Sequence, residues 1–346
     1  MLVISLVALL FIVGCVDETG QPVKQDEKSG ESATSGEVSS DLEGYKQETE
    51  NYKLRFTSAG ETGIYYALGA IFAKFWTDEL PNVTASSAAS NGSVQNLIFM
   101  SQKEADVGLV MSGILSDGYY GRAGFEGQPY ENVRILAGLY PNYNNVVVRE
   151  GAGIESIKDV AGKDFVPGST GSGTEIASQQ IFEAYDMTFD DFTAHFVGFS
   201  ETSDLMRNKQ IVGTNINSGI PTAAVSEMLS TADGKLISID EEQIKMMVDK
   251  YDFYVEATIP AGTYNGQDED VRTTAMPNFL VADADMPDDV AYDLVKSFWE
   301  KLDKMKGSHG VVEQFDIKNV TLGSGDIPFH PGAQAYYEEV GVWDKD

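Results

Sequence analysis

Three turns of similar composition carry residue types that bind small anions. The most informative is Gly168 to Thr174, in which glycine and hydroxyl residues follow the apolar pair Phe165-Val166 and precede a helical pattern from Glu175 to Tyr185. Such a turn directs backbone N–H groups and hydroxyls to one point at the positive end of a helix dipole, which suits an anion. A nucleotide-hydrolysing P-loop has Lys after its last glycine, and this chain has Thr174 and Glu175 there. We therefore expect a small carboxylate or oxyanion ligand and no nucleotide hydrolysis.

Two further turns, Ser58 to Thr62 and Ser90 to Ser93, also stand between a strand pattern and a helix pattern. Each turn taken alone fits an ordinary capped loop, with Ser172 or Thr174 as the cap in the first one. Because ligands of open α/β sheets bind at such junctions, three of them together favour one binding cleft. The predicted ligand contacts are Ser58, Thr62, Tyr65, Asn91, Ser93, Ser169, Thr170, Ser172, Gly173, Thr174, Asn217 and Ser218.

The aromatic and amide residues among these contacts have alternative roles. Tyr65 and Tyr66 begin a helix after the first turn, where they can stack on a ligand or supply a hydroxyl, or belong to the core. Asn217 and Ser218 belong to a fourth predicted turn that ends at Pro221, and they offer an amide and a hydroxyl.

A catalytic or metal site is not indicated. His195, His309 and His330 lack metal-ligand spacing, and no Gly-x-Ser-x-Gly motif occurs. We interpret His195 as a packing residue in a strand. The acidic run Asp283 to Asp289 lacks the central glycine and closing glutamate of a calcium loop, and we expect a turn before a helix there. We assign no catalytic residue, no metal and no cofactor, although 54 acidic residues leave paired carboxylates open.

Alternating strand and helix patterns predict an α/β fold that positions these turns. Two apolar segments, Val146 to Val148 and Met276 to Ala282, are predicted to cross between two lobes and form a hinge. We expect lobe 1 to comprise residues 52–145 and 276–346, and lobe 2 to comprise residues 146–275. The other predicted strands are Tyr52 to Ser58, Val83 to Ala88, Val107 to Met111, His195 to Phe199 and Gln210 to Ile216. The other predicted helices are Ile64 to Phe75, Glu201 to Arg207 and Thr222 to Leu229. A further helix is predicted to begin at Val94, with Ser93 as its cap.

The N-terminal residues have the pattern of a lipoprotein signal. Residues 1–14 are an apolar run, and Ile12-Val13-Gly14-Cys15 resembles the bacterial lipobox, in which Cys15 is lipidated. Residues 16–51 contain almost no large apolar side chains, so we expect a disordered acidic linker. The folded body is then extracytoplasmic and lipid-anchored to the cell membrane. Cys15 is the only cysteine, which excludes a disulfide framework.

The charge of the chain limits its partners. The formal net charge of −30 repels phosphate backbones and excludes a nucleic-acid-binding protein. It also argues against adhesion to anionic lipid. An anionic organic solute must then be attracted by local dipoles, and we expect a monomer.

Several motifs in family order resemble the TAXI group of solute-binding proteins, which serve TRAP transporters. The matching stretches are Gly60 to Gly69, Asn91 to Leu97, Glu104 to Val110, Gly168 to Thr174, Gly219-Ile220-Pro221, Ile259 to Tyr264 and His330 to Ala333 with Tyr336-Tyr337. The resemblance implies a two-lobed, hinged fold of the periplasmic-binding-protein type (type II). It also implies capture of a small organic acid or amino acid, commonly a glutamate-like or dicarboxylate solute, and its delivery to a sodium-coupled permease of the membrane.

Two departures from this family concern the ligand. Val212-Gly213 stands where the family usually has Asp-Ala, and Glu61 stands beside the expected anion site, where the family tends to have glycine. Two other functions are compatible with the same fold. One is a ligand-sensing subunit of a signalling receptor, and the other is a periplasmic enzyme that uses carboxylates.

Overall fold

The computed structural model describes residues 48–343. The predicted signal and Cys15, together with residues 16–47 of the predicted linker, lie outside these residues. Residues 48–51, which that prediction also included, precede the first strand. The backbone N–H groups of Glu48 and Thr49 donate to Asp289 Oδ2 at 2.8 and 2.7 Å. No helix among residues 48–343 has the length and apolar character of a membrane span.

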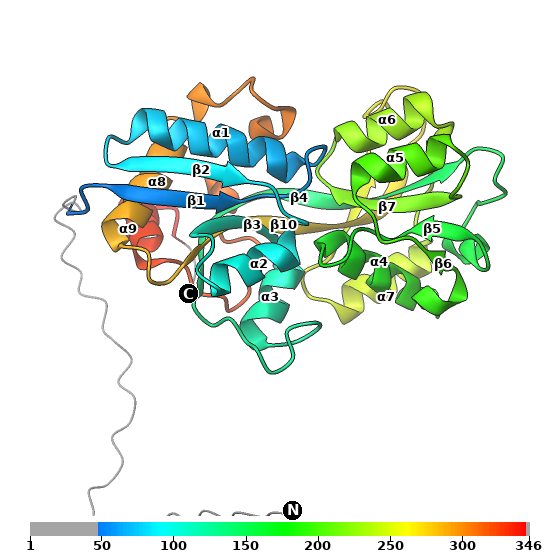
Figure 1. Cartoon of the computed structure of the whole chain (residues 1–346), viewed down its shortest axis with the longest axis horizontal. Helices are drawn as coiled ribbons and strands as arrows, with labels where there is room; N and C mark the ends of the chain where they lie inside the picture. The colour runs from blue at the N-terminus through cyan, green and yellow to red at the C-terminus, as the bar shows by residue number, and fades with distance from the viewer. Residues whose placement is uncertain (1–47, 344–346) are drawn as a thin grey trace, which may run out of the picture. The chain divides into compact units, whose positions relative to one another are not determined.

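Within these residues the strands form one mixed sheet in the order β2-β1-β3-β10-β4-β7-β5-β6, and β8 pairs with β4 and β9 with β10 (Figure 1). Strands β1, β2 and β3 are parallel, as are β5, β6 and β7, whereas β4 and β10 are antiparallel to each other. The strands are β1 (Tyr52–Thr57), β2 (Val83–Ala88), β3 (Val107–Met111), β4 (Val133–Arg149), β5 (Asp164–Val166), β6 (Thr193–Ala194), β7 (Gly213–Ser218), β8 (Gly234–Leu236), β9 (Val255–Ile259) and β10 (Val271–Asp283).

The helices cover the sheet in two groups (Figure 1). The first half of the sheet, β1 to β3, carries α1, α2, α3, α8 and α9, and the second half, β5 to β7, carries α4 to α7. The helices are α1 (Ile64–Glu79), α2 (Ser93–Ser101), α3 (Ser112–Tyr120), α4 (Gly173–Ala184), α5 (Phe199–Arg207), α6 (Ala223–Thr231), α7 (Glu241–Lys250), α8 (Asp288–Glu300) and α9 (Pro331–Glu339).

The long strands β4 and β10 run through both halves. Val146, Val147 and Val148 of β4 are fully buried, as the apolar pattern of this segment predicts. Pro141 of β4 stands opposite Pro277 of β10, and the register shifts directly after Pro277. Proline has no N–H to donate to a sheet ladder, so the pairing of the two strands is weakest at this crossing. This is where we expect the chain to bend when the halves move.

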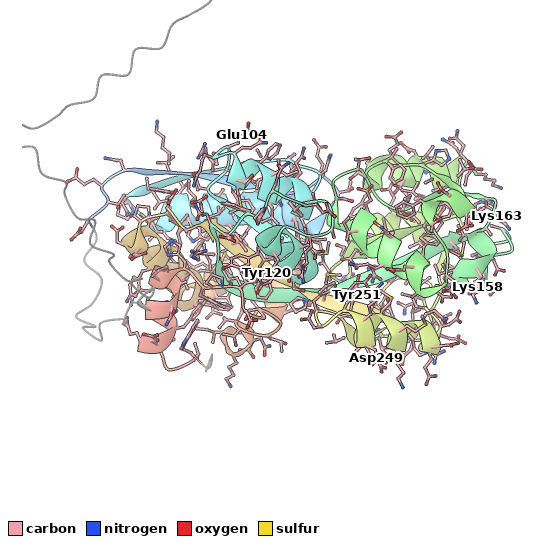
Figure 2. The ribbon with its side chains drawn as sticks, turned by 90° about the horizontal axis from the view of Figure 1, so that it is seen from below. Glu104, Tyr120, Lys158, Lys163, Asp249 and Tyr251 are labelled. Atoms are coloured by element: carbon pink, nitrogen blue, oxygen red, sulfur yellow. The ribbon has the colours of Figure 1, made fainter. Side chains whose placement is uncertain are left out.

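Each half has apolar side chains at the spacing of its elements. In α1, Leu68, Phe72 and Trp76 recur every four residues, and each has no exposed surface. In the second half, Val166, Met206 and Val225 belong to a separate apolar cluster. The outer surface carries charged residues, among them Glu104 on the first half and Lys158, Lys163 and Asp249 on the second (Figure 2).

Several predicted element boundaries were wrong. The strand predicted from His195 to Phe199 is only Thr193–Ala194, and Phe199 begins α5. The strand predicted from Gln210 to Ile216 is shifted to Gly213–Ser218, so Asn217 and Ser218 lie in a strand and not in a turn. Ser93 does not cap α2, because Gly92 is the N-cap and Ser93 is the first helical residue. In β7, hydroxyl and amide side chains gave a turn-like composition to residues whose backbone pairs with β4.

Candidate ligand-binding site

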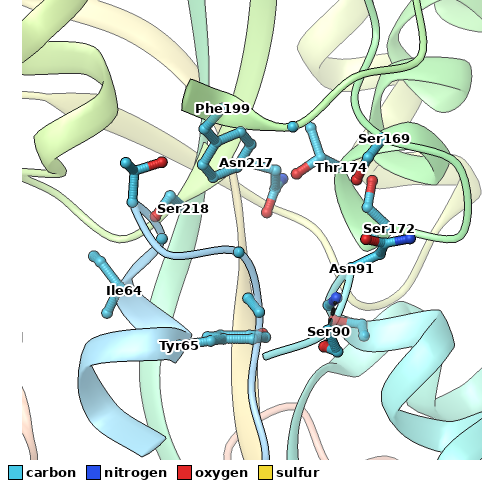
Figure 3. Close-up of a pocket in the computed structure, with 18 of the residues that line it drawn as sticks. Ile64, Tyr65, Ser90, Asn91, Ser169, Ser172, Thr174, Phe199, Asn217 and Ser218 are labelled. Atoms are coloured by element: carbon cyan, nitrogen blue, oxygen red, sulfur yellow. Dashed lines mark hydrogen bonds between the residues drawn. The ribbon is translucent and has the colours of Figure 1, made fainter. Parts of the chain in front are cut away.

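A cavity of about 280 Å³ lies between the first and second halves of the sheet (Figure 3). It is reached from the ends of several strands, where the chain turns into the next helix. The lining residues are Ala59, Gly60, Glu61, Thr62, Gly63, Ile64, Tyr65, Ser90, Asn91, Gly92, Ser93, Met111, Asn142, Ser169, Ser172, Gly173, Thr174, Gly198, Phe199, Ser200, Glu201, Asn217 and Ser218.

Helices α1, α2, α4 and α5 begin at this cavity. Their N-cap residues are Gly63, Gly92, Ser172 and Gly198, and all four line it. At the three glycine caps no side chain accepts a hydrogen bond from the first turn. The first N–H groups of a helix have no partner within the helix, so these ends present donors and positive partial charge to the cavity.

All but two of the predicted contact residues line the cavity. Thr62, Tyr65, Asn91 and Ser93 come from the first half. The second half contributes Ser169, Ser172, Gly173, Thr174, Asn217 and Ser218. The tertiary structure thus brings together turns that lie far apart in the chain, such as those of Asn91 and Thr170, which are 79 residues apart.

Ser58 and Thr170 are the two predicted contacts that do not line the cavity. The Ser58 side chain is buried and donates to the Ala88 carbonyl at 2.7 Å, so it ties β1 to β2. The Thr170 carbonyl accepts a hydrogen bond from Asn91 Nδ2 at 3.2 Å, and Thr170 is an exposed residue of the turn. Both residues are adjacent to the site and support its walls.

Sequence reasoning missed Asn142, Met111 and the start of α5. Asn142 lies in β4 and is 4% exposed. An asparagine set between Tyr140-Pro141 and Tyr143 in this crossing strand was the signal that could have found it. Phe199 was assigned to the end of a strand, although the preceding Gly198 is a typical helix start.

The turn Gly168 to Thr174 satisfies several of its own donors. Ser172 Oγ accepts from the Glu175 N–H at 3.0 Å, which makes it a true N-cap. Glu175 Oε2 accepts from the Gly171 N–H at 2.8 Å. Burial raises the pKa of the Glu175 carboxyl. A carboxylate of the protein itself therefore occupies part of the anion position that the composition of this turn predicts.

The two halves touch along one rim of the cavity. Asn91 Nδ2 donates to the Thr170 carbonyl, and the Gln95 N–H donates to the Gly171 carbonyl, both at 3.2 Å. A Cβ on Gly173 would stand 1.9 Å from Met111 Cε. A larger residue at this position would require the end of the Met111 side chain and Ser93 to move. The described conformation is therefore one in which the two halves are in close contact.

The family of the chain follows from its sequence over nearly the whole described body. The model of the NMT1-like family matches residues 56–341. The chain belongs to the NMT1-like family. Among solved structures, a protein from Bordetella bronchiseptica RB50 is 18% identical, with a TM-score of 0.53 over 86% of this chain and 83% of that one. PhnD1 from Prochlorococcus marinus (MIT 9301), in complex with methylphosphonate, is 12% identical, with a TM-score of 0.53 over 84% of this chain and 99% of that one.

These likenesses establish the fold of this NMT1-like chain. It is the α/β, two-lobed fold of periplasmic binding proteins, with two strands that cross between the lobes, as predicted. The lobe boundaries at residues 145, 146, 275 and 276 stay predictions.

The floor of the cavity in this NMT1-like protein is a network of buried polar groups. Tyr65 donates its hydroxyl proton to Asn278 Oδ1, and Asn278 Nδ2 donates to the Tyr140 carbonyl at 2.9 Å. Burial raises the pKa of Tyr65, while hydrogen bonds with Ser93 and Asn142 act in the opposite direction. The Tyr65 hydroxyl is thus used within the protein, and its ring faces the cavity (Figure 3).

The charges around the cavity come from carboxylates alone. Among the described lining residues none is Lys, Arg or His, while Glu61 and Glu201 contribute exposed side chains at the edge. A ligand carboxylate can therefore be held only by N–H groups, hydroxyls and amides. Such neutral donors are also the groups that helix N-termini supply.

The histidines and the acidic run lie away from the cavity. His195 was predicted to be a packing residue, but its Nε2 lies 2.9 Å from Asp164 Oδ1 in a half-exposed pair. The side chains of His309 and His330 accept hydrogen bonds at helix starts. Asp283 forms an ion pair with Lys103, with 2.7 Å between Oδ2 and Nζ. Within residues 48–343 no cluster of three potential metal ligands occurs.

Proposed function

We propose that this chain is an extracytoplasmic solute-binding protein of a TRAP transporter of the TAXI type. The observation that carries the proposal is the cavity between two halves that, within residues 48–343, only β4 and β10 bridge as long strands. A site whose walls belong to two bodies can open for entry and close on a solute. Solute-binding proteins need this property, whereas a rigid structural domain does not.

The proposed ligand is a small organic acid or amino acid, glutamate-like or dicarboxylate. The cavity of about 280 Å³ is at the lower end of the usual range for ligand sites, which suits a small molecule. Hydrogen bonds to a charged carboxylate contribute about 1.5 to 3 kcal/mol each, so four of them supply roughly 6 to 12 kcal/mol gross. After the costs of association, a micromolar dissociation constant, about −8 kcal/mol, is expected.

Delivery to a membrane permease completes the proposal. The lipobox-like residues before Cys15 support a lipid anchor, which would keep the binding protein near its permease. We propose a sodium-coupled permease as the partner and a monomeric binding protein. A sensor subunit or an enzyme would share the fold, and no contact in the cavity favours either of them.

Isothermal titration calorimetry with purified residues 48–346 tests the ligand class. We expect at least one of L-glutamate, L-glutamine, succinate, glutarate and 2-hydroxyglutarate to bind at micromolar concentration. Mass spectrometry of the purified protein under native conditions should show a small acid retained from the cell. No heat, no thermal shift and no retained acid would contradict the proposal.

A pair of matched variants places that binding in the cavity. Thr174→Val removes a buried hydroxyl from the lining and keeps the shape of the side chain. We expect its affinity to fall about tenfold. Thr222→Val is the control, because Thr222 is equally buried but does not line the cavity. Equal affinities for both variants would place the ligand elsewhere.

Transport separates the proposed partner from a signalling receptor. Proteoliposomes that contain the permease should take up the bound acid only when this protein and a sodium gradient are both present. Uptake that is independent of the protein would contradict the proposed role.

A further inference from the structure

Asn142 places an unpartnered acceptor at the floor of the cavity. The residue lies in β4, is 4% exposed and belongs to the lining. Its Oδ1 is buried and has no hydrogen-bond partner among the described residues. Buried polar atoms almost always have a partner, and leaving one without a partner costs stability. A group from outside the protein is the natural partner for this atom.

The orientation of the Asn142 amide follows from a chain of hydrogen bonds that starts at a backbone carbonyl. The Tyr140 carbonyl can only accept, so the atom of Asn278 that lies 2.9 Å from it must be Nδ2. The other end of the Asn278 amide is then Oδ1, which can also only accept. It receives the hydroxyl proton of Tyr65.

Once Tyr65 has donated its proton, its oxygen can only accept. Burial raises the pKa of Tyr65, and the Ser93 and Asn142 side chains lower it in the way that donors to this oxygen do. The Asn142 atom that faces Tyr65 is therefore Nδ2. The N/O ambiguity that usually affects an asparagine amide is removed here by its neighbours. Oδ1 is the end that remains for a ligand.

A second amide repeats this arrangement on β7. Asn217 is 5% exposed, and its Nδ2 donates to Asn144 Oδ1 at 2.6 Å. The Asn217 Oδ1 is buried without a partner in the described part of the chain. Figure 3 shows Asn217 beside Phe199 and Thr174, in the space that Tyr65 faces from the other wall. The Asn144 side chain is fixed in turn by Thr274, because Asn144 Nδ2 donates to Thr274 Oγ1 at 2.9 Å.

We infer that the solute is an acid that also carries a hydroxyl or amino donor, and that Asn142 Oδ1 is the specificity-determining acceptor for that donor. The inference rests on the proposed function and narrows its ligand class. An acid of the same length without a donor leaves Asn142 Oδ1 unsatisfied. A keto acid places a second acceptor against it. Sites built to bond a donor reject analogues that lack it more strongly than apolar pockets reject a missing methylene.

Four five-carbon acids on one skeleton test this inference by calorimetry. They are glutarate, 2-oxoglutarate, 2-hydroxyglutarate and L-glutamate. We expect 2-hydroxyglutarate or L-glutamate to bind about ten to a hundred times more tightly than glutarate and 2-oxoglutarate. The pair of glutarate and 2-hydroxyglutarate has equal charge, so their ratio isolates the donor. Glutarate or 2-oxoglutarate binding as tightly as the best donor-bearing acid would overturn the inference and leave the proposed function standing.

Two substitutions locate the effect. Asn142→Leu should bring the ratio of 2-hydroxyglutarate to glutarate affinity to within about twofold of unity. Asn82→Leu is its control, because Asn82 Oδ1 is also buried without a partner among residues 48–343 but does not line the cavity. Tyr65→Phe should reduce the ratio because it frees the Asn142 amide to turn, and Tyr66→Phe, at a residue 37% exposed, should not. Ratios unaffected by both Asn142→Leu and Tyr65→Phe would contradict the role of Asn142.

A measurement without ligand examines the orientation of the amide directly. In protein labelled with ¹⁵N-asparagine, the side-chain NH₂ resonance of Asn142 is identified by its loss in Asn142→Leu. We expect this resonance to shift in Tyr65→Phe and to keep its position in Tyr66→Phe. An unshifted resonance in Tyr65→Phe would overturn the inference. If none of the four acids binds, the proposed ligand class is wrong, while this resonance still decides whether the amide is oriented as inferred.

Discussion

The turns at Ser90 to Ser93 and at Gly168 to Thr174 have nearly the same composition and differ in where their donors go. In the first turn Gly92 caps α2 without a side-chain bond, and the Gly92 N–H donates to Ser90 Oγ at 2.9 Å. In the second turn Ser172 caps α4, and the Glu175 carboxylate accepts the Gly171 N–H. Both turns bond N–H groups to their own side chains, since Gln95 Oε1 accepts from the Asn91 N–H at 2.7 Å, but only the second has a side-chain cap on its helix. At the start of α2 the Gln95 N–H instead donates to the Gly171 carbonyl of the other half. Composition alone does not reveal this difference.

The largest expected effect comes from separating the two turns. In Gly173→Val the new Cβ would stand 1.9 Å from Met111 Cε and 3.1 Å from Ser93 Oγ. The two methyl groups of the valine extend beyond this Cβ. Since the Met111 side chain and Ser93 must then move before the halves can close, we expect the affinity for the best-bound acid to fall about tenfold to a hundredfold. Small-angle X-ray scattering should show a larger radius of gyration than in the wild type.

Gly198→Ala is the control for this variant. Gly198 also caps a helix at the cavity, but a Cβ there has no heavy atom within 4 Å. Its affinity and radius of gyration should match the wild type. A Gly173→Val protein with normal affinity would show that the close approach of the two turns is not needed for binding.

A smaller effect concerns the cap of the second turn. Ser172→Ala removes the acceptor of the Glu175 N–H, so the free energy of unfolding should fall by about 1 kcal/mol. Ser169→Ala in the same turn should change it by less than about 0.5 kcal/mol. Urea denaturation measures both. Equal losses would mean that Ser172 acts as a cap no more than its neighbour does, and the contrast between the two turns would disappear.

Of the two hydrogen bonds that join the turns, the one from the Asn91 side chain is expected to contribute less to binding. Asn91→Ala removes the donor to the Thr170 carbonyl at an exposed position. We expect about a threefold loss of affinity, expressed mainly as faster dissociation of the ligand. Stopped-flow kinetics distinguishes the rates. A change confined to the association rate would argue that this bond does not hold the closed state.

The weakest effect is a pH dependence of the second turn. Burial raises the pKa of Glu175, so the folded state keeps its proton to higher pH than the unfolded chain does. The stability contribution of this group therefore falls as pH rises through the interval above its ordinary pKa of 4.5. Glu175→Gln does not titrate and keeps an acceptor for Gly171. Its stability relative to the wild type should increase from pH 4 to pH 7, as thermal unfolding at each pH would show.

Much of the fold was predictable because burial leaves a periodic pattern. The strand at Val83 to Ala88 was predicted with the boundaries that the structure has, and the crossing of Val146 to Val148 and Met276 to Ala282 between the halves is confirmed. The error at Gln210 to Ile216 arose because Thr214, Asn215 and Asn217 are polar yet buried in β7. Their burial depends on partners on β4, such as Asn144, which local periodicity cannot indicate.

The sequence by itself determined which kinds of group surround the cavity, because glycines and hydroxyl residues at strand ends start helices and expose their N–H groups. Only the tertiary structure decided which of those groups remain free. Glu175 fills part of one turn, Tyr65 and Ser93 are used within the floor, and Asn142 is left with an open acceptor. The reason is physical, since a hydrogen bond depends on atoms meeting within about 3 Å. Those meetings join residues that lie far apart along the chain.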